Sequence, residues 1–404
     1  MSDGPARRIA SPAWLRQPAM AALLDTLGEA RFVGGAVRDT LLGLPPGDLD
    51  LATPLEPIET LARLERVGIR TVPTGLSHGT ITAILADDTV VEVTTLRRDV
   101  ETDGRHAIVA FTHDWAADAA RRDFTLNALY LDRSGGIWDP VGGLDDCLAG
   151  RIRFVGAPLQ RIDEDVLRIL RFYRFQARYG RGTPDAEARA ACRRRADRID
   201  RLAGERLQTE TRKLLGATDP TPTARLMTED GVLAAYLPGP FHLDRLAALV
   251  PIEPSADPIR RLAALLDTGA GTAVAERLRL SSTDRDRLVA LTGTNAIDLA
   301  AGDRSQRTAL YRLGVGFYRD FTLLAAAGRG QPERARPLLA LADAWDNPAL
   351  PIGGRDVTAL GIEAGPAVGR LLRLVEEWWI EGDFRADRAA CLDRLTELAA
   401  LAQA

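Results

Sequence analysis

The chain has 404 residues, of which 46% are hydrophobic and 27% are charged, with a formal net charge of −4. This balance is typical of a globular chain that buries a core, and it excludes a largely disordered protein. The length exceeds what one hydrophobic core usually organises, so two to four domains are expected.

Several function classes are excluded by the residue pattern. No run of about 18 apolar residues occurs and the first residues form no apolar secretory segment, so we expect a cytoplasmic protein without a membrane partner. The three cysteines and four histidines are scattered, which fits neither a disulfide framework nor a zinc site. The negative net charge also argues against a protein that coats nucleic acid through bulk charge.

The first 150 residues alternate short strand and helix patterns, which predicts a small mixed α/β domain. The expected strands are 31–34, 80–85, 89–96, 107–111 and 126–132. The expected helices lie around 18–28, 36–43 and 56–67. Beyond about residue 158 the strand signals disappear and helical patterns take over, so the predicted fold class is α+β with a helical remainder.

Residues 31–54 combine a paired glycine with two aspartates. Gly34 and Gly35 follow an apolar strand and precede a helix, so their backbone N–H groups can approach phosphates without side-chain obstruction. Arg38, at the start of that helix, can add a charge-assisted contact to a triphosphate.

The aspartates Asp48 and Asp50 lie two residues apart, so in an extended segment both carboxylates point to the same face. Such a pair can share divalent metals that hold a nucleoside triphosphate and its attacking group together. The alternative is a simple turn, since turns collect aspartate. Glu92, alone among apolar and threonine neighbours on an expected central strand, offers a third carboxylate, which needs a metal, an arginine or a proton if it is buried.

A second informative segment is the helical pattern at 164–175. Asp165, Arg168, Arg171 and Arg174 step by three, so we expect them along one ridge of a helix. Apolar residues surround that ridge on nearly all sides, which predicts a largely interior helix whose charges need partners.

An arginine-dense stretch follows at 177–201. Its centre, Arg193, Arg194 and Arg195, is interpreted either as a surface that contacts RNA phosphates or as a solvated face paired with Asp197 and Asp200.

Seven motifs in this order resemble the bacterial class II CCA-adding enzymes, which are tRNA nucleotidyltransferases, and the closely related bacterial poly(A) polymerases. The motifs are GGAVRD (34–39), LLG (41–43), DLDLAT (48–53), SHGT (77–80), RRDFTLNAL (121–129), DPVGGLDD (139–146) and EDVLRILRFYRF (164–175). The match spans roughly residues 30–215, and a weaker similarity lies at 353–372.

The resemblance implies a polymerase beta-like head and an elongated all-helical C-terminal portion. The implied segments are a head at 1–150, a neck at 151–216, a body at 217–345 and a tRNA-binding tail at 346–404. Asp48 and Asp50 would bind two Mg²⁺ ions, with Glu92 as the third acidic participant. The implied nucleotide-binding residues are Gly34, Gly35, Arg38, Arg122, Asp123, Asp165, Arg168, Arg171 and Arg174.

Within that set, Arg122 would position the nucleotide and Asp123 would approach its ribose, with an ion pair to a neighbouring arginine as the alternative for Asp123. Asp165 and Arg168 would select the base, because cytosine and adenine place an acceptor beside an amine, whereas uracil and guanine reverse both partners. Arg171 and Arg174 are expected to contact phosphates or to order the helix.

The function that the resemblance implies is addition of C, C and A to the 3′ end of tRNA from CTP and ATP. The rivals are a poly(A) polymerase, an enzyme that adds only CC or only A, and a catalytically inactive RNA-binding protein. The expected partners are tRNA and nucleoside triphosphates, not DNA.

Overall fold

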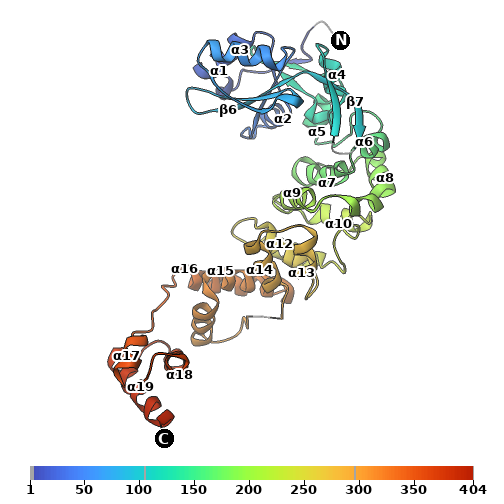
Figure 1. The fold of residues 1–404 in the computed structure, drawn as a ribbon. Coiled ribbons are helices and arrows are strands. Elements are labelled where there is room, and N and C mark those ends of the chain that lie inside the picture. Colours follow the sequence, from blue (N-terminus) through green and yellow to red (C-terminus); the bar gives the residue numbers. More distant parts are fainter. Residues whose placement is uncertain (1–3, 104–105, 295–296, 404) are drawn as a thin grey trace. The chain divides into compact units, whose positions relative to one another are not determined.

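The computed structural model describes residues 4–103, 106–294 and 297–403. They form two compact units, here called the N-terminal unit (Met1–Gly239 with Glu276–Leu280) and the C-terminal unit (Pro240–Ala275 with Ser281–Ala404). Figure 1 shows strands in the blue-to-cyan part of the chain and helices from there on. The expected α+β class is confirmed. The division into head, neck, body and tail segments stays a prediction.

An eight-stranded mixed sheet is the framework of the head. Its strand order is β1-β10-β9-β2-β3-β6-β5-β4, and β3 and β6 are its parallel neighbours. The strands are β1 (Arg7–Arg8), β2 (Arg31–Val33), β3 (Leu49–Thr53), β4 (Arg70–Gly75), β5 (Thr80–Ile84), β6 (Val90–Thr95), β9 (Tyr130–Leu131) and β10 (Gly136–Trp138). The parallel register places Asp50 of β3 opposite Glu92 of β6.

A two-stranded hairpin, β7 (Arg97–Asp103) and β8 (His106–Phe111), lies outside this sheet. Four of the expected strands form, but the fifth is shorter than predicted, because Thr125–Asn127 make a 3₁₀ turn before β9. Strands β1, β4, β7 and β10 were not predicted from the sequence, and β3 was considered only as the condition that the segment around Asp48 and Asp50 is extended. β1 has two residues and β4 contains Pro73, so neither shows a long β-branched run.

Helices cover the sheet and continue the N-terminal unit. They are α1 (Pro18–Leu27), α2 (Gly35–Leu41), α3 (Pro57–Arg66), α4 (Trp115–Ala120), α5 (Leu144–Ala149), α6 (Pro158–Glu164), α7 (Leu167–Tyr179), α8 (Ala186–Arg195), α9 (Gly204–Leu215) and α10 (Thr221–Glu229). Pro18, Pro57 and Pro158 each begin a helix, where the missing N–H has no helical acceptor and the fixed φ already suits the first turn.

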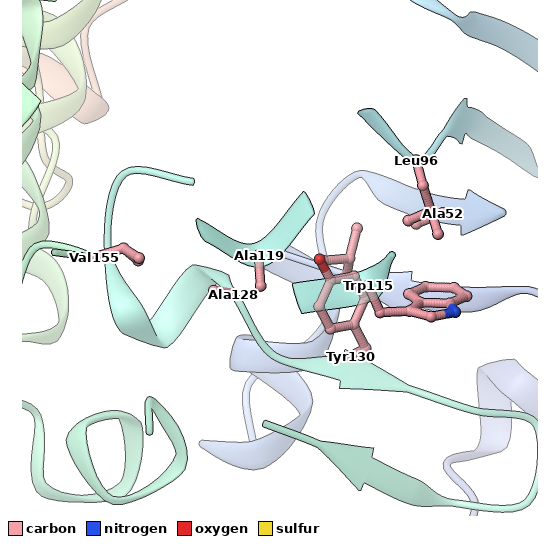
Figure 2. Close-up of a cluster of buried hydrophobic side chains, with 8 residues drawn as sticks. Ala52, Leu96, Trp115, Ala119, Ala128, Tyr130 and Val155 are labelled. Atoms are coloured by element: carbon pink, nitrogen blue, oxygen red, sulfur yellow. The ribbon is translucent and has the colours of Figure 1, made fainter. Parts of the chain in front are cut away.

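One hydrophobic cluster packs β2, β3 and β9 against α4 (Figure 2). Trp115 of α4 meets Tyr130 of β9 edge to face, with ring centroids 5.2 Å apart. Trp115 donates its indole N–H to Glu29 (2.8 Å). The Tyr130 hydroxyl is 2.7 Å from Asp118 Oδ2, so the cluster positions a buried carboxylate at its rim.

The C-terminal unit is helical throughout its described part. Its helices are α11 (Leu243–Leu249), α12 (Pro258–Leu265), α13 (Gly271–Arg277, shared with the N-terminal unit), α14 (Ser282–Leu291), α15 (Asp303–Arg329), α16 (Pro332–Asp343), α17 (Gly354–Ala359), α18 (Pro366–Glu381) and α19 (Arg388–Gln403). Among the described helices, none is long and apolar enough to cross a bilayer.

Helix α15 is bent at Gly314, whose φ of 73° lies in the left-handed region that favours glycine. Before the bend, Arg307 pairs with Asp383 (2.7 and 2.8 Å), and Tyr311 packs on the aromatic cluster of α18. After the bend, Arg319 pairs with Asp343 of α16, and Gly328 lies beside the Arg245 side chain of α11. The Tyr318 hydroxyl donates to the Gln306 side chain (2.8 Å), so a buried hydrogen bond spans the bend.

Candidate active site

The glycine turn joins β2 to α2 beside the two aspartates. Gly34 has a φ of 73°, and a Cβ at this position would lie 3.7 Å from Asp50 Oδ2 and 4.0 Å from Arg122 Nη1. Glycine is therefore favoured here by the backbone conformation, whereas a Cβ would make only ordinary van der Waals contacts with these two side chains. Gly35 is the first residue of α2 and lies beside the Arg38 guanidinium. The phosphate contacts of both glycines stay predictions.

The three predicted carboxylates lie close together at the central strands β3 and β6 of the head sheet. Burial, followed by the negative charge of Glu92, raises the pKa of Asp50 to about 6, while Arg122 opposes this and Asp48 adds to it. Asp48 precedes β3, and Asp50 lies within it. The mutual repulsion of these groups is relieved by a bound cation, so the carboxylates fit a hard metal ion.

Burial, the condition under which Glu92 would need a partner, is not met. Glu92 is exposed, while its neighbours Val91 and Val93 are buried. Successive residues of a strand point to opposite sheet faces, so β6 buries its valines in the core and presents Glu92 with Asp50 on the open face. In the described part of the chain, no three His, Cys, Asp or Glu side chains already form a complete metal cage. An Mg²⁺ ion there would also use water and phosphate oxygens.

Arg122 is held beside the carboxylates by Asp118. Its Nε and Nη2 both donate to Asp118 Oδ2 (3.3 and 2.9 Å), and its Nη1 lies near Gly34. Burial alone would raise the pKa of Asp118, but Arg122, Arg121 and the Tyr130 hydroxyl hold it at about 2. The carboxylate is thus ionised and fixes the guanidinium in place.

Asp123 forms an ion pair with an arginine, as the alternative interpretation of this residue predicts. The arginine lies in α7. Arg171 Nε donates to Asp123 Oδ2 (2.7 Å), and Asn127 Nδ2 donates to Oδ1 (3.0 Å). Burial would raise the pKa of Asp123, but Arg171 and these hydrogen bonds hold it at about 2. Arg174 and Arg171 both face Glu210 of α9, at 2.5 and 3.8 Å. The contacts of Asp123, Arg171 and Arg174 with nucleotide stay predictions.

Arg38 is engaged by the protein itself. Its side chain is buried and donates to Asp39 (2.9 Å), Asn127 (2.7 Å) and the Tyr179 hydroxyl (2.6 Å). The guanidinium also lies 4.1 Å from the centroid of the Tyr179 ring. These contacts tie α2 to α7, and the predicted triphosphate contact would have to share the guanidinium with them.

The expectation of one ridge from Asp165 to Arg174 is wrong at its first member. Asp165 has an extended backbone (φ −152°, ψ 107°) and ends α6. Its Oδ1 accepts from the Leu167 N–H (3.1 Å) at the start of α7, because a short carboxylate competes for free backbone donors at a helix end. Arg206 of α9 donates to Asp165 Oδ2 (2.8 Å). The interior character of α7 is confirmed, since most of its residues are buried.

The arginine block lies at the end of α8. Arg195 pairs with Asp163 of α6 (2.7 and 2.9 Å), and Arg193 is 3.8 Å from Asp230. Arg194 is exposed. The observed pairs therefore run to Asp163 of α6 and to Asp230, whereas the solvated-face interpretation expected Asp197 and Asp200 as partners. The RNA contact stays a prediction.

Four site residues were missed from the sequence. Asp118 could have been found, because it stands three and four residues before Arg121 and Arg122 on a helix. Glu164 likewise stands four residues before Arg168. Arg206 and Glu210 had no local signal, since their partners lie about 40 residues away.

The sheet, the glycine turn and the carboxylate pair define a nucleotidyltransferase head. A family model described as "Poly A polymerase head domain" matches residues 30–153, and one described as "Probable RNA and SrmB- binding site of polymerase A" matches residues 183–242. Beyond these domains, relatives align with nearly the whole chain.

The mitochondrial CCA tRNA nucleotidyltransferase 1 of Mus musculus is 35% identical over 373 residues, which cover 89% of this chain and 85% of the mouse protein. The CCA-adding enzyme of Leuconostoc mesenteroides is 31% identical, covering 93% of this chain and 94% of that enzyme. The chain belongs to the CCA-adding enzyme family and is a tRNA nucleotidyltransferase.

Solved structures agree with this assignment. The Bacillus stearothermophilus CCA-adding enzyme in complex with CTP matches with a TM-score of 0.75 at 26% identity, covering 96% of this chain and 99% of that one. The Thermotoga maritima CCA-adding enzyme complexed with tRNA has a TM-score of 0.70 at 20% identity, covering 97% and 100%, which is a likeness of fold alone.

The Asp118 network predicts an acid-dependent loss of stability. A depressed pKa stabilises the fold above the unfolded-state pKa, and this contribution disappears as pH falls from about 4 towards about 2. Asp118→Asn should therefore lower the free energy of unfolding at pH 7 by about 2 kcal/mol, since the pKa of Asp118 is depressed from 3.8 to about 2. Urea unfolding at several pH values measures this.

The difference between the variant and the parent should stay constant down to about pH 5 and shrink below pH 4. Asp346→Asn, at an exposed aspartate of the C-terminal unit, is the control and should leave stability unchanged within about 0.5 kcal/mol. Equal stability of Asp118→Asn and the parent at pH 7 would show that Asp118 does not hold the arginines.

Proposed function

We propose that this nucleotidyltransferase adds C, C and A in turn to the 3′ end of tRNA, using CTP and ATP. The terminal hydroxyl of the RNA loses its proton as its oxygen bonds to the α-phosphorus, and the bond to pyrophosphate breaks. The observation that carries the proposal is the convergence of Gly34, Asp50, Glu92 and Arg122 on the open face of the head sheet. The cytoplasm is the proposed compartment, although mitochondrial relatives exist.

Asp48 and Asp50 are the proposed ligands of two Mg²⁺ ions, and Glu92 is the third acidic participant. When bound, the ions supply charge neutralisation for the triphosphate and for the attacking and leaving oxygens. Arg122, fixed by Asp118, offers its Nη1 towards the same space and can bind phosphate oxygens. The raised pKa of Asp50 supports a cation here, because crowded carboxylates favour it.

Asp165 and Arg168 are proposed to select the base. Arg168 uses Nη1 for its protein contacts, and within the described part of the chain its Nε and Nη2 have no hydrogen-bond partner. These donors suit the ring acceptor of cytosine or adenine, and Asp165 can accept from the neighbouring amine. Uracil and guanine present the reverse pattern, so each mismatch costs about 1–3 kcal/mol of unpaired polar groups.

The rival function is a poly(A) polymerase with the same head. CCA addition is favoured because the aligned relatives named as CCA-adding cover nearly the full chain. The test uses tRNA transcripts that end before CCA, each labelled nucleotide given separately and then together, and gel resolution of the products. Two CMP additions followed by one AMP are expected, and a long adenylate tail would favour the rival.

The metal-ligand proposal predicts that Asp48→Ala and Asp50→Ala each lower incorporation of both CMP and AMP by at least about a hundredfold, because preorganised charge stabilisation is lost. Binding of tRNA in a filter assay should survive. Asp145→Ala, at an exposed aspartate of α5, serves as control. Activity above a few per cent of the parent in either variant would remove that residue from the metal site.

The base-selection proposal predicts that Asp165→Ala and Arg168→Ala admit UTP and GTP while changing triphosphate binding little. The discrimination ratio between CTP and UTP should fall by about 5-fold to about 150-fold, as expected for one lost contact of about 1–3 kcal/mol. Steady-state kinetics with each nucleotide measures it. Full discrimination in both variants would contradict the proposal.

The RNA proposal predicts that Arg193→Gln, Arg194→Gln and Arg195→Gln together weaken tRNA affinity and flatten its salt dependence by roughly 0.7 to 0.9 in slope per lost phosphate contact. Affinity for CTP should stay unchanged. The control neutralises three exposed arginines of the head, Arg16, Arg66 and Arg133. Parental tRNA binding at three salt concentrations would favour the solvated-face interpretation.

A further inference from the structure

Arg161 of α6 contacts both the loop at Arg121–Asp123 and Arg168 of α7, the proposed base-selecting residue. Neither the sequence motifs nor the proposed chemistry gives Arg161 a role. Its side chain is only 8% exposed. Its Nη2 donates to the backbone carbonyls of Arg121 and Arg122, the second at 2.8 Å. The same guanidinium therefore holds the peptide that leads directly into Asp123.

On the other side, Arg161 reaches Arg168 in two ways. Arg161 Nη1 donates to Glu164 Oε2 (2.5 Å), and Arg168 Nη1 donates to that same oxygen (2.6 Å). Arg168 Nη1 also donates to the Arg161 backbone carbonyl (2.7 Å). Arg168 is thus held through a single nitrogen, by the main-chain carbonyl of Arg161 and by a Glu164 oxygen that the Arg161 side chain also holds.

These contacts are short, charge-assisted and mostly out of water, so they define geometry more strictly than an exposed ion pair does. Arg168 leaves Nε and Nη2 for a ligand, while the loop held by Arg161 carries Arg122 towards Gly34 and Asp50. Arg168 would contact the base edge, and Arg122 the triphosphate. The distance between these two side chains is set by their shared contacts with Arg161.

We propose that Arg161 is a positioning residue. It fixes Arg168, the proposed base-selecting residue, relative to the Arg121–Asp123 loop, so that the base edge and the triphosphate are contacted at a fixed separation. The inference rests on the proposed roles of Arg168 and Arg122. Loss of the Arg161 side chain keeps the main-chain contact of Arg168 but releases Glu164 and the loop carbonyl, so the Arg168 guanidinium can shift relative to the loop and meet the wrong base edge. Nucleotide discrimination is affected more than tRNA binding, because no RNA contact is assigned to Arg161.

The test compares Arg161→Met, Arg161→Lys, Arg168→Ala and the Arg161→Met/Arg168→Ala double variant in the full chain. Single-turnover extension of a tRNA transcript ending before CCA is measured with CTP and with UTP. Arg161→Met should reduce the CTP-to-UTP ratio at least tenfold, and Arg161→Lys, which keeps a cationic donor, at least threefold. In the Arg168→Ala background, Arg161→Met should change the ratio less than twofold, because a residue that acts through Arg168 has nothing left to position.

Arg260→Met is the matched control. Arg260 is also 8% exposed and pairs with buried carboxylates, Glu253 and Asp320, but it lies in α12 of the C-terminal unit. Its loss should lower stability without changing the ratio. The proposal is overturned if Arg161→Met slows CTP and UTP use equally, or if its effect multiplies unchanged with that of Arg168→Ala.

Two other outcomes, a variant that does not fold and a failure of the CCA proposal, can be distinguished from a failure of the Arg161 proposal. If Arg161→Met does not fold, Arg161→Lys decides, and an unchanged ratio in it overturns the proposal. If the parent adds AMP only, the CCA proposal fails while the Arg161 link is still tested by ATP against GTP, since guanine reverses the donor pattern of adenine at the same edge.

Discussion

The carboxylate of Asp118 has to remain ionised although its side chain is almost fully buried in the head, and the surrounding side chains make this possible. Two guanidinium groups and the Tyr130 hydroxyl surround it, and the Tyr130 ring is itself packed against Trp115 in the core. Removing either arginine leaves part of this buried charge uncompensated, and removing the Tyr130 hydroxyl takes away a hydrogen bond to it. The packing of the hydrophobic cluster therefore also determines the orientation of Arg122, through Tyr130 and Asp118.

Buried ion pairs recur from the head into α7 and α9, through Asp123, Arg171, Glu210 and Arg174. Such pairs contribute little net stability, because desolvation of both charges offsets their attraction. Their effect here is geometric, since each partner fixes the rotamer of the next. A site that must accept two bases and reject two others benefits from this rigidity.

The sequence allowed the strand-turn-helix at 31–41 and the interior helix α7 to be predicted, because glycine chemistry and apolar periodicity are local signals. It did not reveal that Asp165 interrupts the helix, since a capping carboxylate and a helical one look alike in a three-residue step. The exposure of Glu92 depends on which sheet face is covered, and that is a tertiary property. The partners Arg206 and Glu210 could not be predicted either, because spacing along the chain carries no information on contacts between helices.

The bend at Gly314 has a consequence for how the C-terminal unit can change over evolution. Because one left-handed residue divides α15, substitutions on the segment that carries Arg307 and Tyr311 need not propagate into the segment packed on α16. The Tyr318–Gln306 hydrogen bond nevertheless braces the two segments against each other. The two segments of α15 on either side of Gly314 can therefore be substituted separately, while the angle between them is kept.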